Sequence, residues 1–207
     1  ELFNGDYSKI KHLDKELSAR FGFPKVFGVS GQTYDRKIDA KVVALLSNIA
    51  QSAHKFSNDL RLLQNLKEIE EPFEKNQIGS SAMAYKRNPM RSERIGALAK
   101  FVMSLSSSSA MVASTQWFER TLDDSANKRL TIPQAFLAID AILLIWNNIM
   151  DGIVVYENRI NKHIMDELPF MATEYIIMEE VKAGGDRQEI HEIIRIHSME
   201  ASKKVKI

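Results

Sequence analysis

The sequence predicts an all-α protein: a bundle of long helices with a smaller helical domain after it. Three observations support this prediction. Apolar residues recur every three or four positions over many turns, a helix-start signal precedes a second such stretch, and a third stretch is apolar on nearly every side. A content of 44% hydrophobic and 27% charged residues is that of an ordinary globular chain with a sizeable core.

The first long helix is predicted over residues 38–63. Its apolar positions keep helical spacing without a break: Ile38, Val42, Leu45, Ile49, Ala53, Phe56, Leu60 and Leu63. This spacing gathers them into one stripe along the helix and suits near-parallel packing in a bundle.

A second helix is predicted to start at Asn88-Pro89, which reads as an N-cap residue followed by proline at the first helical position. Its buried stripe is expected to comprise Ile95, Leu98, Val102, Leu105 and Val112. Ser109 falls on the same stripe, where its small side chain would let a neighbouring helix approach closely.

A third helix is predicted to start at Thr131, because residues 131–134 resemble a capping box. Residues 136–146 are apolar on almost every side, so other helices must surround this one. One chain of 207 residues supplies few such helices, and we therefore expect partner subunits to supply the rest. The apolar run 135–146 is too short to span a bilayer and includes Asp140.

Two polar segments, residues 71–87 and 113–130, are predicted to be long ordered loops, and such loops often carry function. After Gly152 the helical pattern becomes shorter, with breaks at Pro169 and Gly184-Gly185. We therefore expect residues 1–154 to be part of a central helical-bundle domain and residues 155–207 to begin a C-terminal helical domain.

The composition excludes several classes of site. A net charge of +1 gives no case for a nucleic-acid or membrane-surface partner. The absence of cysteine excludes disulfides, a thiol nucleophile and a cysteine zinc site. No grouping of His, Asp and Glu has the spacing of metal ligands, so we expect no metal and no cofactor.

Four cations surround the predicted start of the second helix: Lys86, Arg87, Arg91 and Arg94. Cations at a helix N-terminus oppose its dipole, at a cost of roughly 0.3–1 kcal/mol each. A multiply charged anion held by the dipole, the free N–H groups and these side chains would explain them, and a solvated basic face is the alternative. Ser80, in Gly79-Ser80-Ser81, reads as a turn residue, or as a base if the nearby cations stabilise its alkoxide.

Residues 79–89, GSSAMAYKRNP, resemble the signature loop of the fumarase/aspartase superfamily, Gly-Ser-Ser-x-Met-Pro-x-Lys-x-Asn-Pro. The one departure is Ala84, where that superfamily has proline. Other stretches resemble the adenylosuccinate lyase family: SGQTY at 30–34, EEPFEK at 70–75, YKRNPMRSER at 85–94, QWFERTLDDSAN at 116–127 and ELPFMATE at 167–174. The resemblance covers essentially the whole chain and implies the long-helix bundle of the fumarase/aspartase type.

The resemblance implies a lyase that eliminates fumarate from adenylosuccinate, giving AMP, and from the succinylocarboxamide ribotide of purine biosynthesis. Ser80 would take the proton from carbon, and Lys86 and Asn88 would stabilise the doubly charged intermediate, with one such donor worth roughly 3–4 kcal/mol. Five residues match the family's substrate-binding positions: Gln32, Arg94, Arg120, Ser125 and Arg129.

The resemblance also implies a homotetramer whose active sites are shared between subunits, and the absence of cysteine fits a cytoplasmic location. The family's general-acid histidine belongs to an N-terminal part that this chain is expected to lack. We therefore expect the chain to cover the C-terminal two-fifths or more of the protein and to be inactive alone, and none of its 5 histidines should replace that acid.

Two other functions stay open on the sequence. One is another lyase of the superfamily, acting on argininosuccinate, malate or aspartate, and the other is a non-catalytic helical oligomerisation core. Without the resemblance, Arg120 and Arg129 could equally pair with Glu119, Asp123 or Asp124 on a loop surface.

Overall fold

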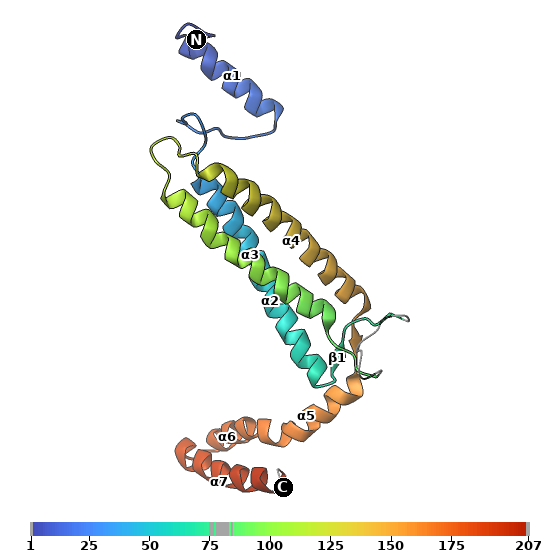
Figure 1. Cartoon of the computed structure of the whole chain (residues 1–207). Helices are drawn as coiled ribbons and strands as arrows, with labels where there is room; N and C mark the ends of the chain where they lie inside the picture. The colour runs from blue at the N-terminus through green and yellow to red at the C-terminus, as the bar shows by residue number, and fades with distance from the viewer. Residues whose placement is uncertain (1, 75–76, 78–82, 84, 206–207) are drawn as a thin grey trace. The chain divides into compact units, whose positions relative to one another are not determined.

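Helices make up nearly all regular structure in the computed structural model, which describes residues 2–74, 77, 83 and 85–205 (Figure 1). The elements follow in the order α1 (Tyr7–Arg20), α2 (Lys37–Asn65), β1 (Ile69–Glu70), α3 (Met90–Ser114), α4 (Asp124–Gly152), β2 (Val154–Val155), α5 (Glu157–Met171), α6 (Thr173–Lys182) and α7 (Arg187–Val205). The predicted all-α fold is confirmed.

The chain divides into two compact units, the first comprising Glu1–Lys55 and Arg94–Ile145 and the second Phe56–Glu93 and Trp146–Ile207. Each of the three long helices contributes residues to both units. The expected boundary between residues 154 and 155 stays a prediction.

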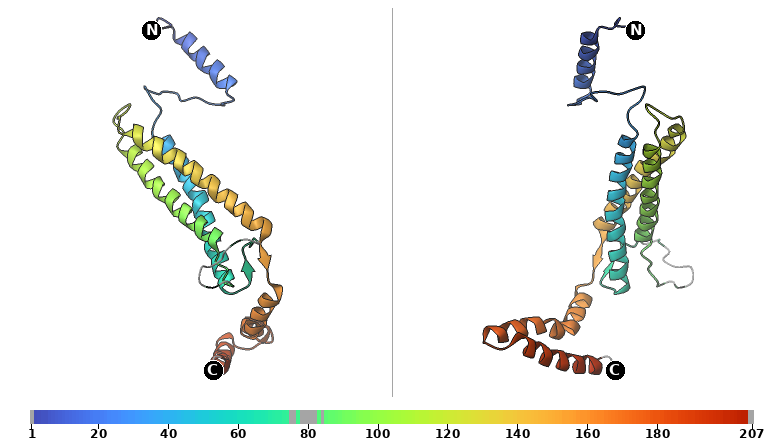
Figure 2. Two further views of the ribbon diagram at one scale, coloured as in Figure 1. Left: turned by 45° about the vertical axis from the view of Figure 1, so that its right-hand side comes forward. Right: turned by 90° about the vertical axis from the view of Figure 1, so that its left-hand side faces the viewer.

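The core of the first unit forms where α2, α3 and α4 lie side by side, as both views of Figure 2 show. Its fully buried side chains include Val43, Ala50 and Ala53 of α2, Ile95, Ala99 and Val102 of α3, and Ala135 and Ile142 of α4. Alanine at so many buried positions lets the helix backbones approach closely. Ser109 of α3 is buried as well, as predicted for a small residue on that stripe.

The buried stripe of α2 differs from the predicted one. Ala53 and Leu60 are buried, but Leu45 is exposed, and the buried positions before them include Val43, Leu46 and Ala50. The helix carries apolar residues at adjacent positions, and spacing alone does not decide which of two neighbours faces the core.

The predicted start of the third helix was wrong by seven residues, because α4 begins at Asp124 and contains Pro133 in its interior. Thr131 does not cap this helix: its hydroxyl donates to the carbonyl of Asn127, at 3.0 Å, one turn earlier. The Asn127 amide in turn donates to the Ser108 hydroxyl of α3 at 2.8 Å. These contacts hold the first turns of α4 in place despite the proline, so the loop before it is shorter than expected.

The apolar residues of α4 face two ways. Ala135, Ile139 and Ile142 are buried, while Leu137 and Leu144 are 70% and 63% exposed. By length and composition alone α3 and α4 would suffice to cross a bilayer, with mean hydropathies of 1.3 and 1.5 over 18 residues. The apolar run 135–146 alone is too short to span a bilayer, whereas the whole of α4 is long enough, and helices surrounded by other helices have the same composition.

In the second unit, a short antiparallel ladder joins the segment after α2 to the segment after α4. Ile69 pairs with Val155 and Glu70 with Val154. The rings of Phe56 and Trp146 stack with their centroids 4.7 Å apart. Beyond the ladder, α5 continues through Pro169, and the turn between α6 and α7 uses Gly184 at a φ of +99°.

Candidate functional site

The predicted site residues fall into two groups. Gln32, Arg94, Arg120, Ser125 and Arg129 belong to the first unit, and Lys86 and Asn88 belong to the second. Ser80 and Ala84 lie outside the described residues.

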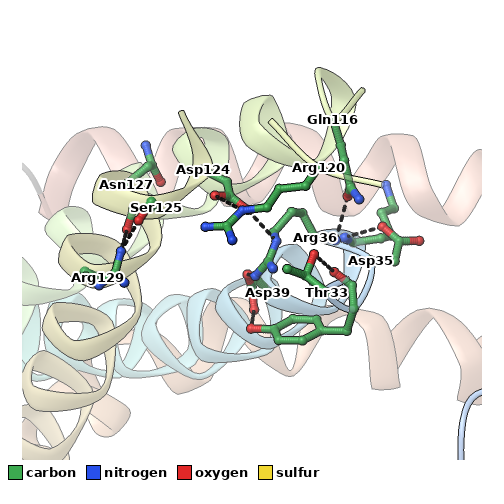
Figure 3. Close-up of polar contacts among 12 residues, drawn as sticks. Thr33, Asp35, Arg36, Asp39, Gln116, Arg120, Asp124, Ser125, Asn127 and Arg129 are labelled. Atoms are coloured by element: carbon green, nitrogen blue, oxygen red, sulfur yellow. Dashed lines mark hydrogen bonds and ion pairs between the residues drawn. The ribbon is translucent and has the colours of Figure 1, made fainter. Parts of the chain in front are cut away.

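In the first unit, Arg120 lies beside a buried carboxylate at the start of α4. Its side chain is 26% exposed, and its Nε is 3.6 Å from Oδ1 of Asp124, which is 2% exposed. The other carboxylate oxygen, Oδ2, is 2.7 Å from Nε of Arg36, a residue whose side chain is 1% exposed. Asp124 therefore lies between two guanidinium groups (Figure 3).

Arg36 makes two further side-chain contacts. Its Nη1 donates to Oδ2 of Asp39 at 3.1 Å, and its Cζ lies 4.3 Å from the centre of the Tyr34 ring. Burial disfavours the charge of Arg36, but the hydrogen bond to Asp39 and the attraction of Asp124 outweigh it, so the pKa of Arg36 is raised. The Tyr34 hydroxyl donates to Oδ1 of Asp39 at 2.7 Å, and burial together with this bond raises the pKa of Tyr34.

This ion-pair network is balanced in charge, since Arg36 and Arg120 face Asp39 and Asp124. Neither oxygen of Asp124 accepts a hydrogen bond from the described residues, so ion pairs alone compensate its burial. A buried carboxylate without such pairing would cost several kcal/mol. The sequence left open that Arg120 pairs with a nearby acidic residue, and the structure shows this pairing with Asp124.

Hydrogen bonds also join the two backbone segments that carry Gln32 and Arg120. The N–H of Arg36 donates to Oε1 of Gln116 at 2.8 Å, and Nε2 of Gln116 donates to the carbonyl of Glu119, also at 2.8 Å. The N–H of Gln32 is 3.5 Å from Oε2 of Glu119. An open cleft lies between these segments, with Tyr34, Gln116 and Glu119 among its lining residues.

Glycine at position 31 allows this approach. A Cβ there would lie 2.7 Å from Cδ of Glu119, so a larger residue would push the carboxylate away from the Gln32 N–H. The reason for a glycine at position 31 is its contact with the Glu119 side chain, which the sequence alone does not show.

Ser125 and Arg129 face each other one helical turn apart on α4. Nη1 of Arg129 donates to the Ser125 carbonyl at 2.8 Å and contacts the Ser125 hydroxyl (Figure 3). Arg129 is otherwise exposed, and so is Arg94 near the start of α3. The first unit thus carries exposed or half-exposed guanidinium groups that could bind an anion.

In the second unit, the anion site predicted at the start of α3 is occupied by a carboxylate of this chain. Glu71, 5% exposed, accepts the N–H of Arg91 at 3.0 Å and that of Ser92 at 2.6 Å. Glu71 therefore caps these N–H groups of the helix start. The sequence had predicted that they would be free to bind a ligand, and they are not. Position 71 lies in a loop 19 residues before α3, so local spacing gave no signal for this cap.

The cations near this helix start also differ from one another. Arg87 pairs with Glu70 at 3.1 Å, and Arg91 pairs with Glu74 at 2.9 Å. Lys86 is exposed and lines an open cleft together with Asn88, and no acidic partner of Lys86 is found among the described residues. Two of the four cations thus serve the chain itself.

Gln64 of α2 lines the same cleft and joins two neighbouring segments. Its Nε2 donates to the carbonyl of Arg87 at 3.1 Å, and its Oε1 accepts the N–H of Glu71 at 3.3 Å. One amide side chain therefore holds both the residue that caps α3 and the stretch that carries Lys86 and Asn88.

Histidine chemistry is sparse in the described residues. His163 is half-buried and its Nδ1 contacts Oε1 of Glu68. Within the described ranges, no three His, Asp or Glu side chains come together as a potential metal site.

Two family models match the chain, described as "Lyase" over residues 4–104 and "Adenylosuccinate lyase C-terminus" over residues 169–207. Among curated relatives, the adenylosuccinate lyase of Schizosaccharomyces pombe is 55% identical and that of Saccharomyces cerevisiae 56% identical, each over 205 residues. Both matches cover 99% of this chain and 42% of the relative, so the chain spans well under half of their length.

Solved structures share the fold. A fumarate lyase from Mesorhizobium sp. BNC1 matches with a TM-score of 0.74 and 21% identity, over 92% of this chain and 41% of that one. A 3-carboxy-cis,cis-muconate lactonizing enzyme from Pseudomonas putida matches with a TM-score of 0.66 and 22% identity, over 80% and 36%. At such identities the likeness concerns the fold alone.

Proposed function

Because this chain belongs to the adenylosuccinate lyase family, we propose that the intact protein eliminates fumarate from adenylosuccinate and releases AMP. The same enzyme would also eliminate fumarate from the succinylocarboxamide ribotide of purine biosynthesis. The observation that carries the proposal is the identity of 55% over 99% of the chain to an adenylosuccinate lyase.

In the proposed reaction, the Ser80 oxygen takes a proton from the carbon next to a carboxylate of the succinyl group. The electron pair left on carbon is delocalised into that carboxylate, which then carries two negative charges. As the carbon–nitrogen bond breaks, a new carbon–carbon double bond forms, and the nitrogen takes the bonding electrons and a proton. A group outside this chain supplies that proton.

Lys86 is suited to stabilise the doubly charged intermediate, with Asn88 beside it. Its ammonium is exposed on the cleft, whereas the neighbouring Arg87 and Arg91 already pair with acidic side chains. Positive charge placed in advance where negative charge develops is usually the largest single catalytic contribution.

The anionic and polar groups of the substrate would be held by Gln32, Arg94, Arg120, Ser125 and Arg129. Arginine suits this role because its planar guanidinium binds carboxylate or phosphate through two parallel hydrogen bonds. Arg120 supports the assignment, since it remains partly exposed while its partner Asp124 has a second cation.

We further propose a cytoplasmic homotetramer that builds each active site from several subunits, without a nucleic-acid or membrane partner, cofactor or metal. The exposed apolar side chains of α3 and α4 support assembly, because partner helices would cover them. Residues 155–207 would begin a separate helical domain.

The proposal is tested by offering the purified intact protein adenylosuccinate, argininosuccinate, malate and aspartate in parallel and measuring product formation. We expect turnover of adenylosuccinate and none of the other three. Preferential turnover of argininosuccinate, malate or aspartate would contradict the assignment of substrate, and absence of all turnover would leave only an assembly role.

A further inference from the structure

Arg36 lies at the junction of the two segments that carry Gln32 and Arg120. It immediately precedes α2, and its guanidinium contacts Asp39 of α2 through Nη1, at 3.1 Å, and Asp124 of α4 through Nε, at 2.7 Å. A single planar group therefore joins two helices that are far apart in the sequence. Its side chain is almost wholly buried, so it is placed to act on its neighbours and not on a ligand.

The main chain of Arg36 is fixed as well. Gln116 accepts its N–H and donates to the carbonyl of Glu119, the residue next to Arg120. Gln32 lies four residues before Arg36, and Arg120 lies four residues before Asp124. Side chain and backbone of Arg36 thus set how far apart the two segments stand (Figure 3).

Asp124 attracts the two guanidinium groups unequally, as its distances to them show. Its carboxylate is 2.7 Å from Arg36 and 3.6 Å from Arg120, and ionic attraction weakens with distance. Arg36 is therefore the stronger partner of Asp124, and the carboxylate compensates the positive charge of Arg120 less closely.

We propose that Arg36 is a positioning residue that holds Gln32 and Arg120 at the separation a two-ended anionic substrate requires. The inference rests on the proposed function, because it takes both residues as substrate-binding. A ligand that reaches both segments depends on their separation, whereas a ligand that contacts only one segment does not.

The test uses the intact protein carrying Arg36→Lys, which keeps the charge but can hold only one of the two carboxylates at a time. KM and kcat are measured with adenylosuccinate, and the Kd values of fumarate alone and of AMP alone are measured by calorimetry. We expect KM to rise about 10-fold or more, because small misplacements of binding groups are costly. The two Kd values should change by no more than about threefold.

Gln116→Met provides a second variant that changes no charge and removes both hydrogen bonds of the Gln116 amide. Even if Arg36→Lys fails to fold, Gln116→Met should raise KM for adenylosuccinate and leave the Kd values of fumarate and AMP nearly unchanged. Arg195→Lys is the matched control, since Arg195 forms an exposed pair with Glu192 on α7, and it should leave all four constants unchanged.

The outcomes separate the inference from the function. Wild-type turnover with unchanged KM in both variants overturns the inference alone, as does equal weakening of adenylosuccinate, fumarate and AMP. Absence of turnover by the wild type overturns the proposed function and the inference with it.

Discussion

Acidic neighbours determine which basic side chains near the start of α3 can serve a ligand. Arg87 and Arg91 look like Lys86 in the sequence, but Glu70 and Glu74 lie 3.1 and 2.9 Å from their guanidinium groups. Lys86 faces the cleft that it lines with Asn88. Basic residues in one short stretch therefore have different roles, and the acidic partners of each residue indicate its role.

Lys86→Met tests this division, since it removes the ammonium and keeps an unbranched side chain. We expect kcat of the intact protein for adenylosuccinate to fall about 10²–10³-fold, the usual effect of losing one preorganised charge-stabilising group. Lys67→Met is the matched control, because Lys67 is an exposed lysine on the same cleft. Equal losses in both variants would mean that the cleft needs general positive charge, not Lys86.

Glu71→Gln tests the internal cap of α3. The amide loses the carboxylate's charge and presents a donor to one of two backbone N–H groups, so we expect unfolding to become easier by about 1–3 kcal/mol. Urea unfolding of the intact protein measures the change. Glu74→Gln, at an exposed ion pair, should cost less than about 1 kcal/mol. Similar values for both would show that Glu71 is not a cap.

Tyr34 gives a prediction for alkaline pH. Its pKa is raised above the ordinary 10.0 by burial and by the bond to Asp39, so the folded protein holds this proton more tightly than the unfolded chain. The resulting stability is complete below pH 10.0 and is lost as the pH rises through the folded-state value. Tyr34→Phe should therefore lose less stability between neutral and alkaline pH in urea unfolding, and an unchanged slope would contradict this.

At the scale of elements, periodicity predicted the existence and type of the long helices, and α2 begins one residue before Ile38. Asn88-Pro89 predicted the start of α3 to within about a residue. The start of α4 was wrong because contacts with other segments, at Asp124 and Asn127, hold residues that look polar and loop-like by themselves.

The candidate site divides in the same way. Ser80, Lys86 and Arg120 could be chosen from the sequence through their resemblance to a known signature. Arg36 and Asp124 could not, since their pairing joins positions 88 residues apart, and no local pattern announces such an ion pair. The role of Glu71 could not be predicted either, because it caps residues 20 and 21 positions later in the chain.

Pro133→Ala tests whether the proline truly lies inside α4. Proline costs about 3 kcal/mol relative to alanine in a helix interior but almost nothing at a helix start. We expect this exposed substitution to raise the free energy of unfolding by about 1–3 kcal/mol. Pro89→Ala, at the start of α3, should change it little. No gain from Pro133→Ala would favour the helix start first predicted at Thr131.

At the scale of the whole molecule, the apolar residues that α4 leaves exposed are those that the proposed assembly would cover. Leu137→Glu combined with Leu144→Glu places charges on this face, and we expect the proposed four-copy assembly to dissociate into smaller species. Light scattering of the intact protein measures the mass. Leu2→Glu, at a more exposed leucine, should leave the assembly whole, and an unaltered mass in the double variant would remove the assembly role of α4.

In the proposed mechanism, Ser80 starts an elimination that Lys86 makes possible. The most direct measurement is the fumarate released from adenylosuccinate by the intact Ser80→Ala protein, compared with wild type in samples of equal mass by light scattering. We predict one fumarate per AMP with the wild type and a rate lower by about 10³-fold or more in the variant. A variant that releases fumarate at the wild-type rate would contradict the claim.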